Sequence, residues 1–394
     1  MAPPTGPPTG PRRGPRPLLL HLTLAMLRSS VSLAGSMDWK PGSPNWKRPA
    51  AVEAEAGFLR GIQAWHAHPW RRDVPDAPVA WTEGGARLLD YGGDGPVVLF
   101  VPSLVNRWTV LDLMAGHSML RWLASEGVHP MLLDWGEPEP AFTLTDHIAG
   151  RLVRAMDAAR AESGKVILAG YCMGGTFAVA AAAVRPDLVS GLVLLAAPWD
   201  FHAGTVERLH RLEATRALLE PLLQGVESVP IDLLQALFAL DDPGAVAEKF
   251  RRFAHLDPAS EAARLFVAVE DWLNDGVPLS GTTARECLRD WYGGNLPMRG
   301  TWRIAGLTID PASIAVPALV AVPRQDRIVP PESARVLADL LPNATLLEPA
   351  AGHVGMTAGR GAPKVLWEPM RDWLRTVGGG AKKRTARSRA GARK

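Results

Sequence analysis

The chain has 394 residues, of which 47% are hydrophobic and 21% charged, a composition typical of a globular protein with one large domain or two smaller ones. Its two cysteines exclude a disulfide framework and suit a reducing cytoplasm. The net charge of +3 falls to −4 without the seven basic residues of the last 14 positions, so a nucleic-acid-binding body is not expected.

The two ends of the chain differ in composition from the rest. Residues 1–17 are rich in proline and glycine, and residues 378–394 are glycine-rich and then basic, so both segments are predicted to be disordered. Residues 18–27 are apolar but too short for a membrane span, and no clear signal-peptide cleavage site follows them. Residues 18–80 are therefore predicted to form a helical extension, and we expect no transmembrane segment.

Strands and helices alternate from about residue 81 onward. Apolar segments of strand length, bounded by turn residues, are followed by segments with helical periodicity. The predicted strands are residues 87–91, 97–101, 131–133, 166–169, 192–196, 318–322 and 344–347. The predicted helices among them are residues 146–161, 176–184, 333–341 and 365–377.

This order predicts an α/β fold with a mostly parallel central sheet and helices on both of its faces. The alternation stops over residues 199–315, which have a mostly helical pattern and are predicted to form a cap or lid. The sheet domain would then consist of a first part, residues 81–198, and a second part, residues 316–377.

A candidate nucleophile lies between a predicted buried strand and a predicted helix. Residues 170–175 read Gly-Tyr-Cys-Met-Gly-Gly, and a sharp turn there would expose Cys172 above the sheet. Side chains two residues before and after the nucleophile would collide, which explains Gly170 and Gly174. The alternative is an inert buried thiol, the interpretation that we prefer for Cys287. The strand–turn–helix context favours Cys172 as the nucleophile of an α/β-hydrolase fold.

The residues expected to assist Cys172 follow later strands. In this fold the order along the chain is nucleophile, acid, histidine, and Asp326 and His353 each follow a predicted strand. We expect His353 to take the proton of Cys172 and Asp326 to hold the other ring nitrogen. Asp200 is a rival acid, and Asp326 would otherwise cap a helix or pair with Arg327.

An oxyanion hole requires two backbone N–H donors. The first is expected from Met173, directly after the nucleophile. The second is expected from the loop after strand 97–101. Pro102 has no N–H, so Ser103 or Leu104 would supply it.

The motifs together resemble those of the polyhydroxyalkanoate synthases, enzymes of the α/β-hydrolase superfamily. Gly-Tyr-Cys-Met-Gly-Gly is similar to the G-x-C-x-G-G box of that family, in which cysteine replaces the serine of lipases. Similar motifs occur at residues 101–113, 133–138 (Leu-Asp-Trp-Gly-Glu-Pro) and 352–355 (Gly-His-Val-Gly), and weaker ones at 196–202 and 271–275. The size is similar to that of the catalytic subunit of two-subunit synthases, although the N-terminal extension and the basic tail depart from that pattern.

The resemblance implies a Cys-His-Asp triad that polymerises 3-hydroxyacyl-CoA. Cys172 would take the acyl group as a thioester and release CoA, and the 3-hydroxyl of a second unit would then attack that thioester. The resemblance further implies substrate-binding roles for Asn106, Trp135 and Trp272. It implies no metal and no cofactor apart from the CoA thioester that is the substrate.

The expected partners are the acyl-CoA, the polyester product, and either a second copy of the chain or a helical partner subunit. The expected location is cytoplasmic, on polyester granules, and no specific nucleic acid is expected. One alternative is a thioesterase or another α/β-hydrolase that acts on acyl esters or thioesters. A second is an inactive granule-associated protein.

Overall fold

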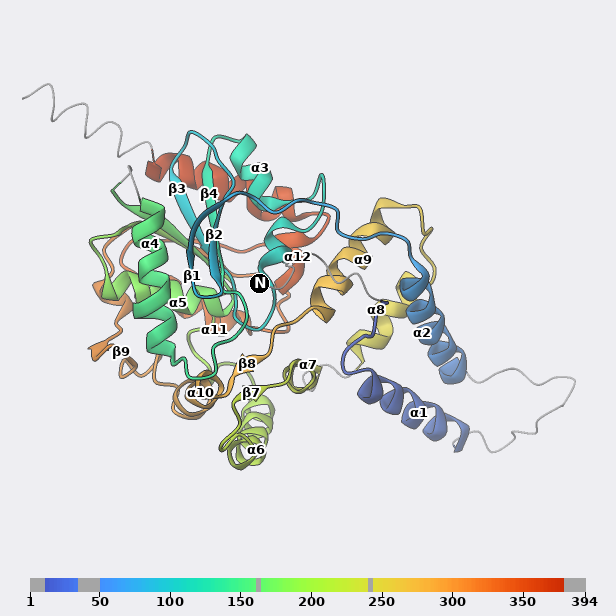
Figure 1. Ribbon diagram of the computed structural model, residues 1–394. Coiled ribbons are helices and arrows are strands. Elements are labelled where there is room, and N and C mark those ends of the chain that lie inside the picture. Colours follow the sequence, from blue (N-terminus) through green and yellow to red (C-terminus); the bar gives the residue numbers. More distant parts are fainter. Residues whose placement is uncertain (1–10, 35–49, 161–163, 240–243, 379–394) are drawn as a thin grey trace, which may run out of the picture. The chain divides into compact units, whose positions relative to one another are not determined.

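The computed structural model describes residues 11–34, 50–160, 164–239 and 244–378 (Figure 1). The chain divides into two compact units. Unit 1 contains Met1–Arg72 and Pro230–Gly276, and unit 2 contains Asp73–Val229 and Val277–Lys394. This division differs from the predicted boundaries, because the middle of the predicted cap groups with the N-terminal segment. The remaining cap residues belong to the unit that contains the sheet.

Unit 2 is built on an eight-stranded sheet in the order β1-β2-β4-β3-β5-β6-β11-β12. The strands are β1 (Val79–Glu83), β2 (Ala86–Asp90), β3 (Val97–Val101), β4 (His129–Asp134), β5 (Val166–Tyr171), β6 (Val189–Leu195), β11 (Ala318–Ala321) and β12 (Ala344–Leu347). From β4 to β12 neighbouring strands are parallel, whereas β2 is antiparallel to both β4 and β1. The predicted mostly parallel sheet is confirmed.

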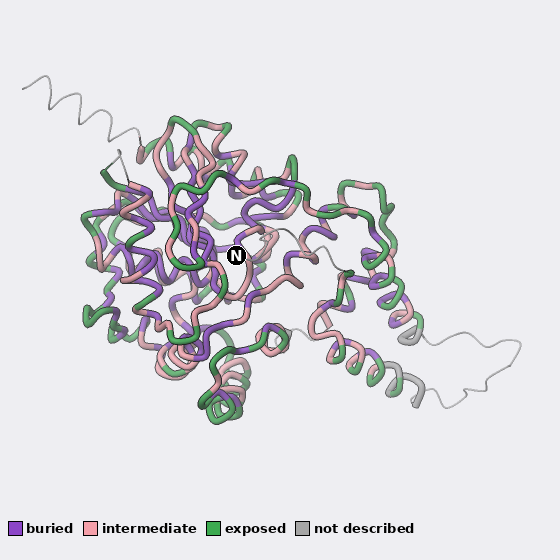
Figure 2. Tube along the Cα trace, in the orientation of Figure 1, coloured by how far each residue is buried: buried purple, intermediate pink, exposed green. Residues whose placement is uncertain are grey.

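The central strands form where the sequence is continuously apolar. All six residues of β5 are buried, as are six of the seven in β6, because helices cover both faces of a parallel sheet (Figure 2). β1 was not predicted. It lies at the edge of the sheet, and most of its residues are exposed, so its sequence lacks an apolar run.

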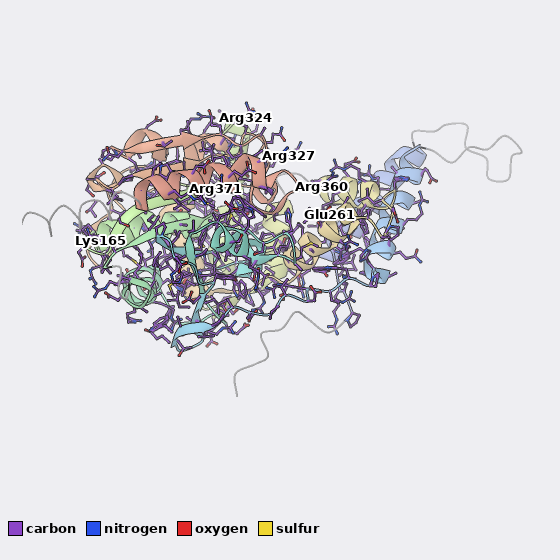
Figure 3. The ribbon with its side chains drawn as sticks, turned by 90° about the horizontal axis from the view of Figure 1, so that it is seen from above. Lys165, Glu261, Arg324, Arg327, Arg360 and Arg371 are labelled. Atoms are coloured by element: carbon purple, nitrogen blue, oxygen red, sulfur yellow. The ribbon has the colours of Figure 1, made fainter. Side chains whose placement is uncertain are left out.

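Helices flank the sheet of unit 2. The described helices are η1 (Trp108–Asp112), α3 (Met119–Ser125), η2 (Asp146–Leu152), α4 (Val153–Arg160), α5 (Met173–Val184), α6 (Val206–Leu222), α10 (Gly281–Glu286), η3 (Cys287–Gly293), η4 (Pro311–Ser313), α11 (Pro331–Leu340), α12 (His353–Ala358) and η5 (Pro363–Trp367), which continues as a helix to residue 378. Arg371 on that last helix pairs with Glu126 at 2.9 Å, directly after α3 (Figure 3). Short strands β7 (Ser228–Val229) and β8 (Leu279–Ser280) pair with each other, as do β9 (Arg303–Ile304) and β10 (Leu307–Thr308).

Unit 1 is helical and is assembled from two separate segments of the chain. Its described helices are α1 (Leu18–Ala34), α2 (Ala50–Ala67), α7 (Ile231–Ala239), α8 (Ala245–Phe253) and α9 (Glu261–Asn274). Phe58 and Trp65 on α2 form its core with Phe250 on α8 and Val267 on α9. A Cβ on Gly61 would lie 2.0 Å from the carbonyl oxygen of Phe250, so only glycine permits α2 and α8 to approach this closely.

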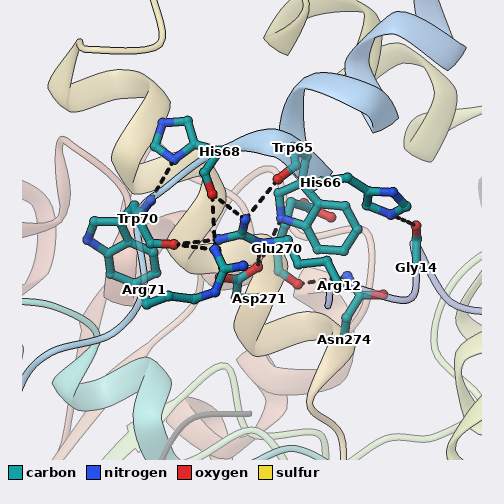
Figure 4. A network of polar contacts seen from close by, with 10 residues as sticks. All are labelled: Arg12, Gly14, Trp65, His66, His68, Trp70, Arg71, Glu270, Asp271 and Asn274. Atoms are coloured by element: carbon teal, nitrogen blue, oxygen red, sulfur yellow. Dashed lines mark hydrogen bonds and ion pairs between the residues drawn. The ribbon is translucent and has the colours of Figure 1, made fainter. Parts of the chain in front are cut away.

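Residues 11–17 are bound to the helices of unit 1, and the predicted disorder of this stretch is therefore wrong. The side chain of Arg12 is only 5% exposed and pairs with Asp271 through two bonds, from Nε at 2.6 Å and from Nη2 at 2.8 Å (Figure 4). Its remaining N–H groups donate to the carbonyl oxygens of Trp65, His68 and Trp70. A buried guanidinium with all its donors satisfied orders the backbone around it.

Two more contacts hold the same segment. The N–H of Arg16 donates to Oδ1 of Asn274 at 2.7 Å, and Nε2 of His66 lies 3.1 Å from the carbonyl oxygen of Gly14. Residues 1–10 and 379–394 lie outside the described residues, so their predicted disorder stays a prediction. No described helix combines the length and the apolarity that a membrane span requires.

Candidate active site

Cys172 occupies the sharp turn between β5 and α5. Its backbone has φ 55° and ψ −127°, a region that costs a non-glycine residue on the order of 1–3 kcal/mol. The N–H of Cys172 donates to the carbonyl oxygen of Leu195 at 2.9 Å, and the N–H of Gly175 donates to that of Cys172 at 2.8 Å. These bonds hold the strained turn, and the thiol is partly exposed.

Three glycines make this turn possible, each through a different contact. A Cβ on Gly170 would lie 2.4 Å from the carbonyl oxygen of Gly174. A Cβ on Gly174 would lie 2.0 Å from the carbonyl oxygen of Val101, at the end of β3. A Cβ on Gly175 would lie 2.3 Å from Cβ of Ala197. The turn motif in the sequence explains the first two glycines, whereas the contact of Gly175 with the loop after β6 depends on the tertiary structure.

His353 and Asp326 meet at the carboxyl edge of the sheet. His353 is the first residue of α12 after β12, Asp326 follows β11, and Nδ1 of His353 lies 2.7 Å from Oδ2 of Asp326. The other carboxylate oxygen of Asp326 accepts the N–H groups of Ile328 and Val329 at 2.8 and 2.9 Å. Asp326 therefore binds the histidine with one oxygen and fixes its own loop with the other.

The electrostatic environment keeps His353 charged. Burial by itself lowers the pKa of a histidine, but the charges of Cys172 and Asp326, with hydrogen bonds to both side chains, raise the pKa of His353 to about 10. The imidazole thus holds a proton at neutral pH, as it would after taking one from a neighbouring thiol. This is the charge state that a histidine–cysteine pair requires for nucleophilic attack.

Asp200, the rival acid, has other partners. Its Oδ1 accepts Nδ2 of Asn295 at 2.8 Å and the N–H of His202 at 3.0 Å. Asn295 also accepts the N–H of Phe201 at 3.0 Å through its side-chain oxygen. In the described residues, Asp200 thus anchors the loop after β6, whereas Asp326 contacts His353.

Tyr171 is a residue near His353 that the sequence analysis missed. Its ring lies 5.1 Å from the ring of His353, and its hydroxyl donates to the carbonyl oxygen of His353 at 3.4 Å. Burial raises the pKa of Tyr171 well above its usual value, so the hydroxyl stays a neutral donor. Its position next to Cys172 in the motif was the one available signal.

The short helix α12 is also held at its other end. Nε1 of Trp367 donates to the carbonyl oxygen of Thr357 at 3.0 Å, and Nε2 of His117 lies 3.0 Å from that of Ala358. These contacts satisfy carbonyls that the end of a helix leaves free. Because they come from residues distant in sequence, no local pattern predicted them.

The loop after β3 lies beside the start of α5. The close approach of Gly174 to the carbonyl oxygens of Val101 and Pro102 shows this contact. Met173 is the first residue of α5, so its N–H has no partner within the helix. Within the described residues, the N–H groups of Ser103 and Leu104 donate to no backbone carbonyl. No backbone carbonyl of the described part of the chain is thus shown to accept the N–H groups of Ser103 and Leu104, and the oxyanion hole stays a prediction.

The residues predicted to bind substrate lie in different places. Trp135 is buried, and its Nε1 donates to the carbonyl oxygen of Pro102 at 3.0 Å, so its observed contact supports the loop after β3. Asn106 lies in the same loop, and its buried Oδ1 has no hydrogen-bond partner among the described residues. Trp272 is buried on α9, in unit 1, and unit 2 does not include it. Their substrate-binding roles stay predictions.

The second cysteine has an unreactive environment. Cys287 is buried at the start of η3, and burial raises its pKa well above the usual value. It therefore remains a neutral thiol. Within the described part of the chain, no cluster of three or more His, Cys, Asp or Glu side chains is arranged to hold a metal ion.

Comparison with known proteins agrees with this fold and with the resemblance in the sequence. The model of the alpha/beta hydrolase fold family matches residues 138–357. The poly(3-hydroxyalkanoate) polymerase subunit PhaC of Haloferax mediterranei is 32% identical over 75% of this chain, and the aligned part spans 63% of that protein's length. The PhaC subunits of Allochromatium vinosum and a Synechocystis strain are each 30% identical over 70% of this chain and are covered over 80% and 77% of their own lengths.

The identity to these subunits covers most of their length, and the matched fold model covers more than half of this chain, including Cys172, Asp326 and His353. The chain therefore belongs to the family of poly(3-hydroxyalkanoate) polymerase PhaC subunits, within the alpha/beta hydrolase fold.

Proposed function

We propose that this chain is an acyltransferase that polymerises 3-hydroxyacyl groups from CoA thioesters through a covalent thioester on Cys172. The observation that supports it most directly is the contact geometry at the carboxyl edge of the sheet. A strained, partly exposed cysteine faces a charged histidine, which is in turn held by a buried carboxylate at 2.7 Å. The named activity of the related PhaC subunits supports the same reaction.

The proposed acylation step moves one acyl group and one proton. The thiolate of Cys172 attacks the thioester carbonyl, and the oxyanion accepts hydrogen bonds from the N–H of Met173 and from that of Ser103 or Leu104. The C–S bond to CoA then breaks, and the departing thiolate takes the proton of His353. CoA leaves as a free thiol, and His353 is left neutral with Asp326 at its other nitrogen.

The proposed elongation step restores the starting state. His353 takes the proton of the 3-hydroxyl of a second acyl unit, and that oxygen attacks the Cys172 thioester. An ester bond forms as the bond to the sulfur breaks, so Cys172 returns as a thiolate beside a charged His353. No cofactor other than the CoA thioester takes part in this scheme.

The proposed partners follow from the product and from the relatives. A PhaC is named as a subunit of a polymerase, which supports a partner subunit or a second copy of this chain. Because the proposed polyester product is apolar, the protein is proposed to lie on polymer granules. The part of the predicted cap that belongs to unit 2, residues 199–229 and 277–315, is proposed to exclude water during elongation, since a hydrolase must admit water and a polymerase must not.

Product analysis with 3-hydroxybutyryl-CoA tests the proposal. Wild-type protein and the Cys287→Ser variant should both release CoA and form polymer, whereas Cys172→Ala should do neither. The Cys287 variant is a matched control, because it also loses a thiol. Free 3-hydroxy acid as the sole product, even with a helical partner subunit, would replace the proposal with the thioesterase alternative. No CoA release at all would favour the inactive granule protein.

A further inference from the structure

Three exposed arginines lie on the loops that carry Asp326 and His353 (Figure 3). Arg324 and Arg327 flank Asp326 in the loop after β11, and Arg360 lies two residues beyond the end of α12. We call these three residues the basic rim. Each is a positive charge at the same edge of the sheet as Cys172.

Backbone contacts join the two loops of the basic rim. The N–H of Arg324 donates to the carbonyl oxygen of Pro349 at 3.0 Å, and the N–H of Gln325 donates to that of Ala351 at 3.0 Å. Helix α12 has six residues and is therefore about 9 Å long, so the two further residues to Arg360 keep its backbone within about 16 Å of that of His353. The basic rim is thus a local feature of the candidate site and not a scattered set of surface charges.

Two acidic residues close to the basic rim in sequence, Glu348 and Asp326, are already bound to other groups. Glu348 pairs with Arg335, and Asp326 is buried and bonded to His353 and to its own loop. Among the described residues, Arg324 and Arg360 have neither an ion-pair partner nor a side-chain hydrogen bond, whereas Arg335 and Arg371 are paired. Clustered exposed cations at a site create a positive potential that attracts an anionic ligand. Solvated surface arginines are common, and what distinguishes these is their placement on the two loops that carry Asp326 and His353.

We propose that the basic rim binds the phosphate groups of the CoA part of the incoming acyl-CoA, an inference that rests on the proposed function. An acyl-CoA has its reactive thioester at one end and its phosphates at the other, joined by a neutral arm. A nucleophile with a cationic rim on its surrounding loops matches this distribution of charge. Guanidinium groups bind phosphate oxygens through paired hydrogen bonds.

The test compares acyl-CoA with the acyl-pantetheine thioester, which has the same reactive end and no phosphates. In the double variant Arg324→Gln/Arg360→Gln, the KM for 3-hydroxybutyryl-CoA should rise about tenfold or more, the effect of losing charge-assisted hydrogen bonds. The kcat should stay the same, and so should the KM for the pantetheine thioester. Added salt should raise the KM of the wild type for acyl-CoA and leave that of the variant nearly constant.

Lys165→Gln provides the matched control. Lys165 is an exposed cation directly before β5, at the opposite edge of the sheet, so its loss should leave both KM values unchanged. An unchanged KM for acyl-CoA in the double variant would overturn the inference. An equal rise with both thioesters would also overturn it, since the arginines would then act by positioning Asp326 and His353.

Direct binding separates this inference from the proposed function. Calorimetric titration of CoA into Cys172→Ala protein, with and without the two arginine substitutions, requires no turnover. Binding about tenfold weaker in the substituted protein would support the basic rim even if neither thioester is consumed. Equal binding by the two proteins would refute it, whatever the catalytic result.

Discussion

At the scale of single residues, the two cysteines of this chain have opposite environments. Cys172 is partly exposed in a strained turn and interacts with a charged His353, whereas Cys287 is buried and its pKa is raised well above the usual value. The reactivity of a thiol follows its ionisation and its access to solvent. Substitution of Cys287 can therefore serve as a control for substitution of Cys172, the candidate nucleophile.

We expect Cys172→Ala to abolish CoA release from 3-hydroxybutyryl-CoA without unfolding the protein. Cys172→Ser should be far less active than the wild type, because a serine hydroxyl is hardly ionised beside the same histidine. CoA release is measured with a thiol reagent, and circular dichroism checks the fold. Undiminished release by a folded Cys172→Ala protein would remove the basis of the proposed mechanism.

The raised pKa of His353 predicts how the reactivity of Cys172 depends on pH. The pKa of about 10 exceeds the ordinary 6.5, so His353 stays charged through neutral pH and loses its proton only as pH rises through about 10. CoA release from 3-hydroxybutyryl-CoA should therefore keep its rate between about pH 7 and 9 and fall only as pH approaches 10, where His353 loses its proton. In His353→Gln the rate should be far lower and should show no fall near pH 10, because the histidine proton is absent. Identical pH profiles for the two proteins would contradict the pairing.

The same shift affects stability. A histidine whose pKa is raised by folding stabilises the folded state fully below its unfolded pKa of 6.5, and this contribution is lost as pH rises through about 10. The gap in unfolding free energy between wild type and His353→Gln should therefore be larger at pH 6 than at pH 10.5. Urea unfolding at the two pH values measures it.

At the scale of elements, close approaches of backbone position the site. Helix α5 starts against the end of β3 through Gly174 and against the loop after β6 through Gly175. Tyr171, Trp367 and His117 then fix α12, which carries His353. Cys172 therefore precedes a helix whose start is held on two sides, and His353 lies on a short helix that is held at both ends.

Gly175→Ala should destabilise unit 2, because its Cβ would lie 2.3 Å from Cβ of Ala197. Overpacking of this kind costs about 1–3 kcal/mol, and activity should fall because Cys172 moves with α5. Adding Ala197→Gly removes the opposing methyl group and should restore part of the stability. Urea unfolding of the single and double variants measures both effects, and a double variant no better than the single one would point to another cause.

The contact between residues 11–17 and α9 predicts a second effect on stability. Arg12→Ala leaves Asp271 without its charged partner and removes one of the hydrogen bonds that the carbonyl oxygens of Trp65, His68 and Trp70 accept. Breaking a buried pair of this kind costs about 3 kcal/mol. Hydrogen exchange should therefore accelerate in α2 and α9. Arg13→Ala, at an exposed neighbouring position, is the control, and equal exchange in both variants would contradict the structural role of Arg12.

At the scale of the whole molecule, the chain forms two units of different construction. Unit 2 contains the sheet and the candidate catalytic residues, and unit 1 is helical and draws on two segments far apart in sequence. The segment 199–315, predicted as one cap, contributes α6, α10 and η3 to unit 2 and α7, α8 and α9 to unit 1.

The basic tail is predicted to be dispensable for the reaction. It lies beyond the last described helix and has seven positive charges in its last 14 residues. Deletion of residues 382–394 should leave the turnover of 3-hydroxyacyl-CoA unchanged and weaken, in a salt-dependent way, any binding to DNA or another anionic surface. Steady-state kinetics and binding at two salt concentrations measure the two effects. A large fall in turnover would show that the tail takes part in the reaction.

The sequence by itself determined the α/β class, most strands of the sheet and the location of Cys172, because their signals are local. Buried parallel strands require continuous apolar runs, and the sharp turn at Cys172 requires glycine at fixed spacing. Most residues of the edge strand β1 are exposed, so its sequence contains no continuous apolar run. The order of Asp326 and His353 along the chain was visible in the same way, since both follow predicted strands.

Only the tertiary structure decided which partner each polar residue takes. Asp200 is bonded to Asn295, 95 residues away, and this contact distinguishes it from Asp326. Arg12 is ordered by Asp271, 259 residues away, so a proline- and glycine-rich segment that looked disordered is bound to unit 1. Tyr171 and Trp135 likewise acquire their contacts from distant loops. Hydrogen bonds between segments far apart in sequence depend on how the chain packs, and no local pattern of residues records that packing.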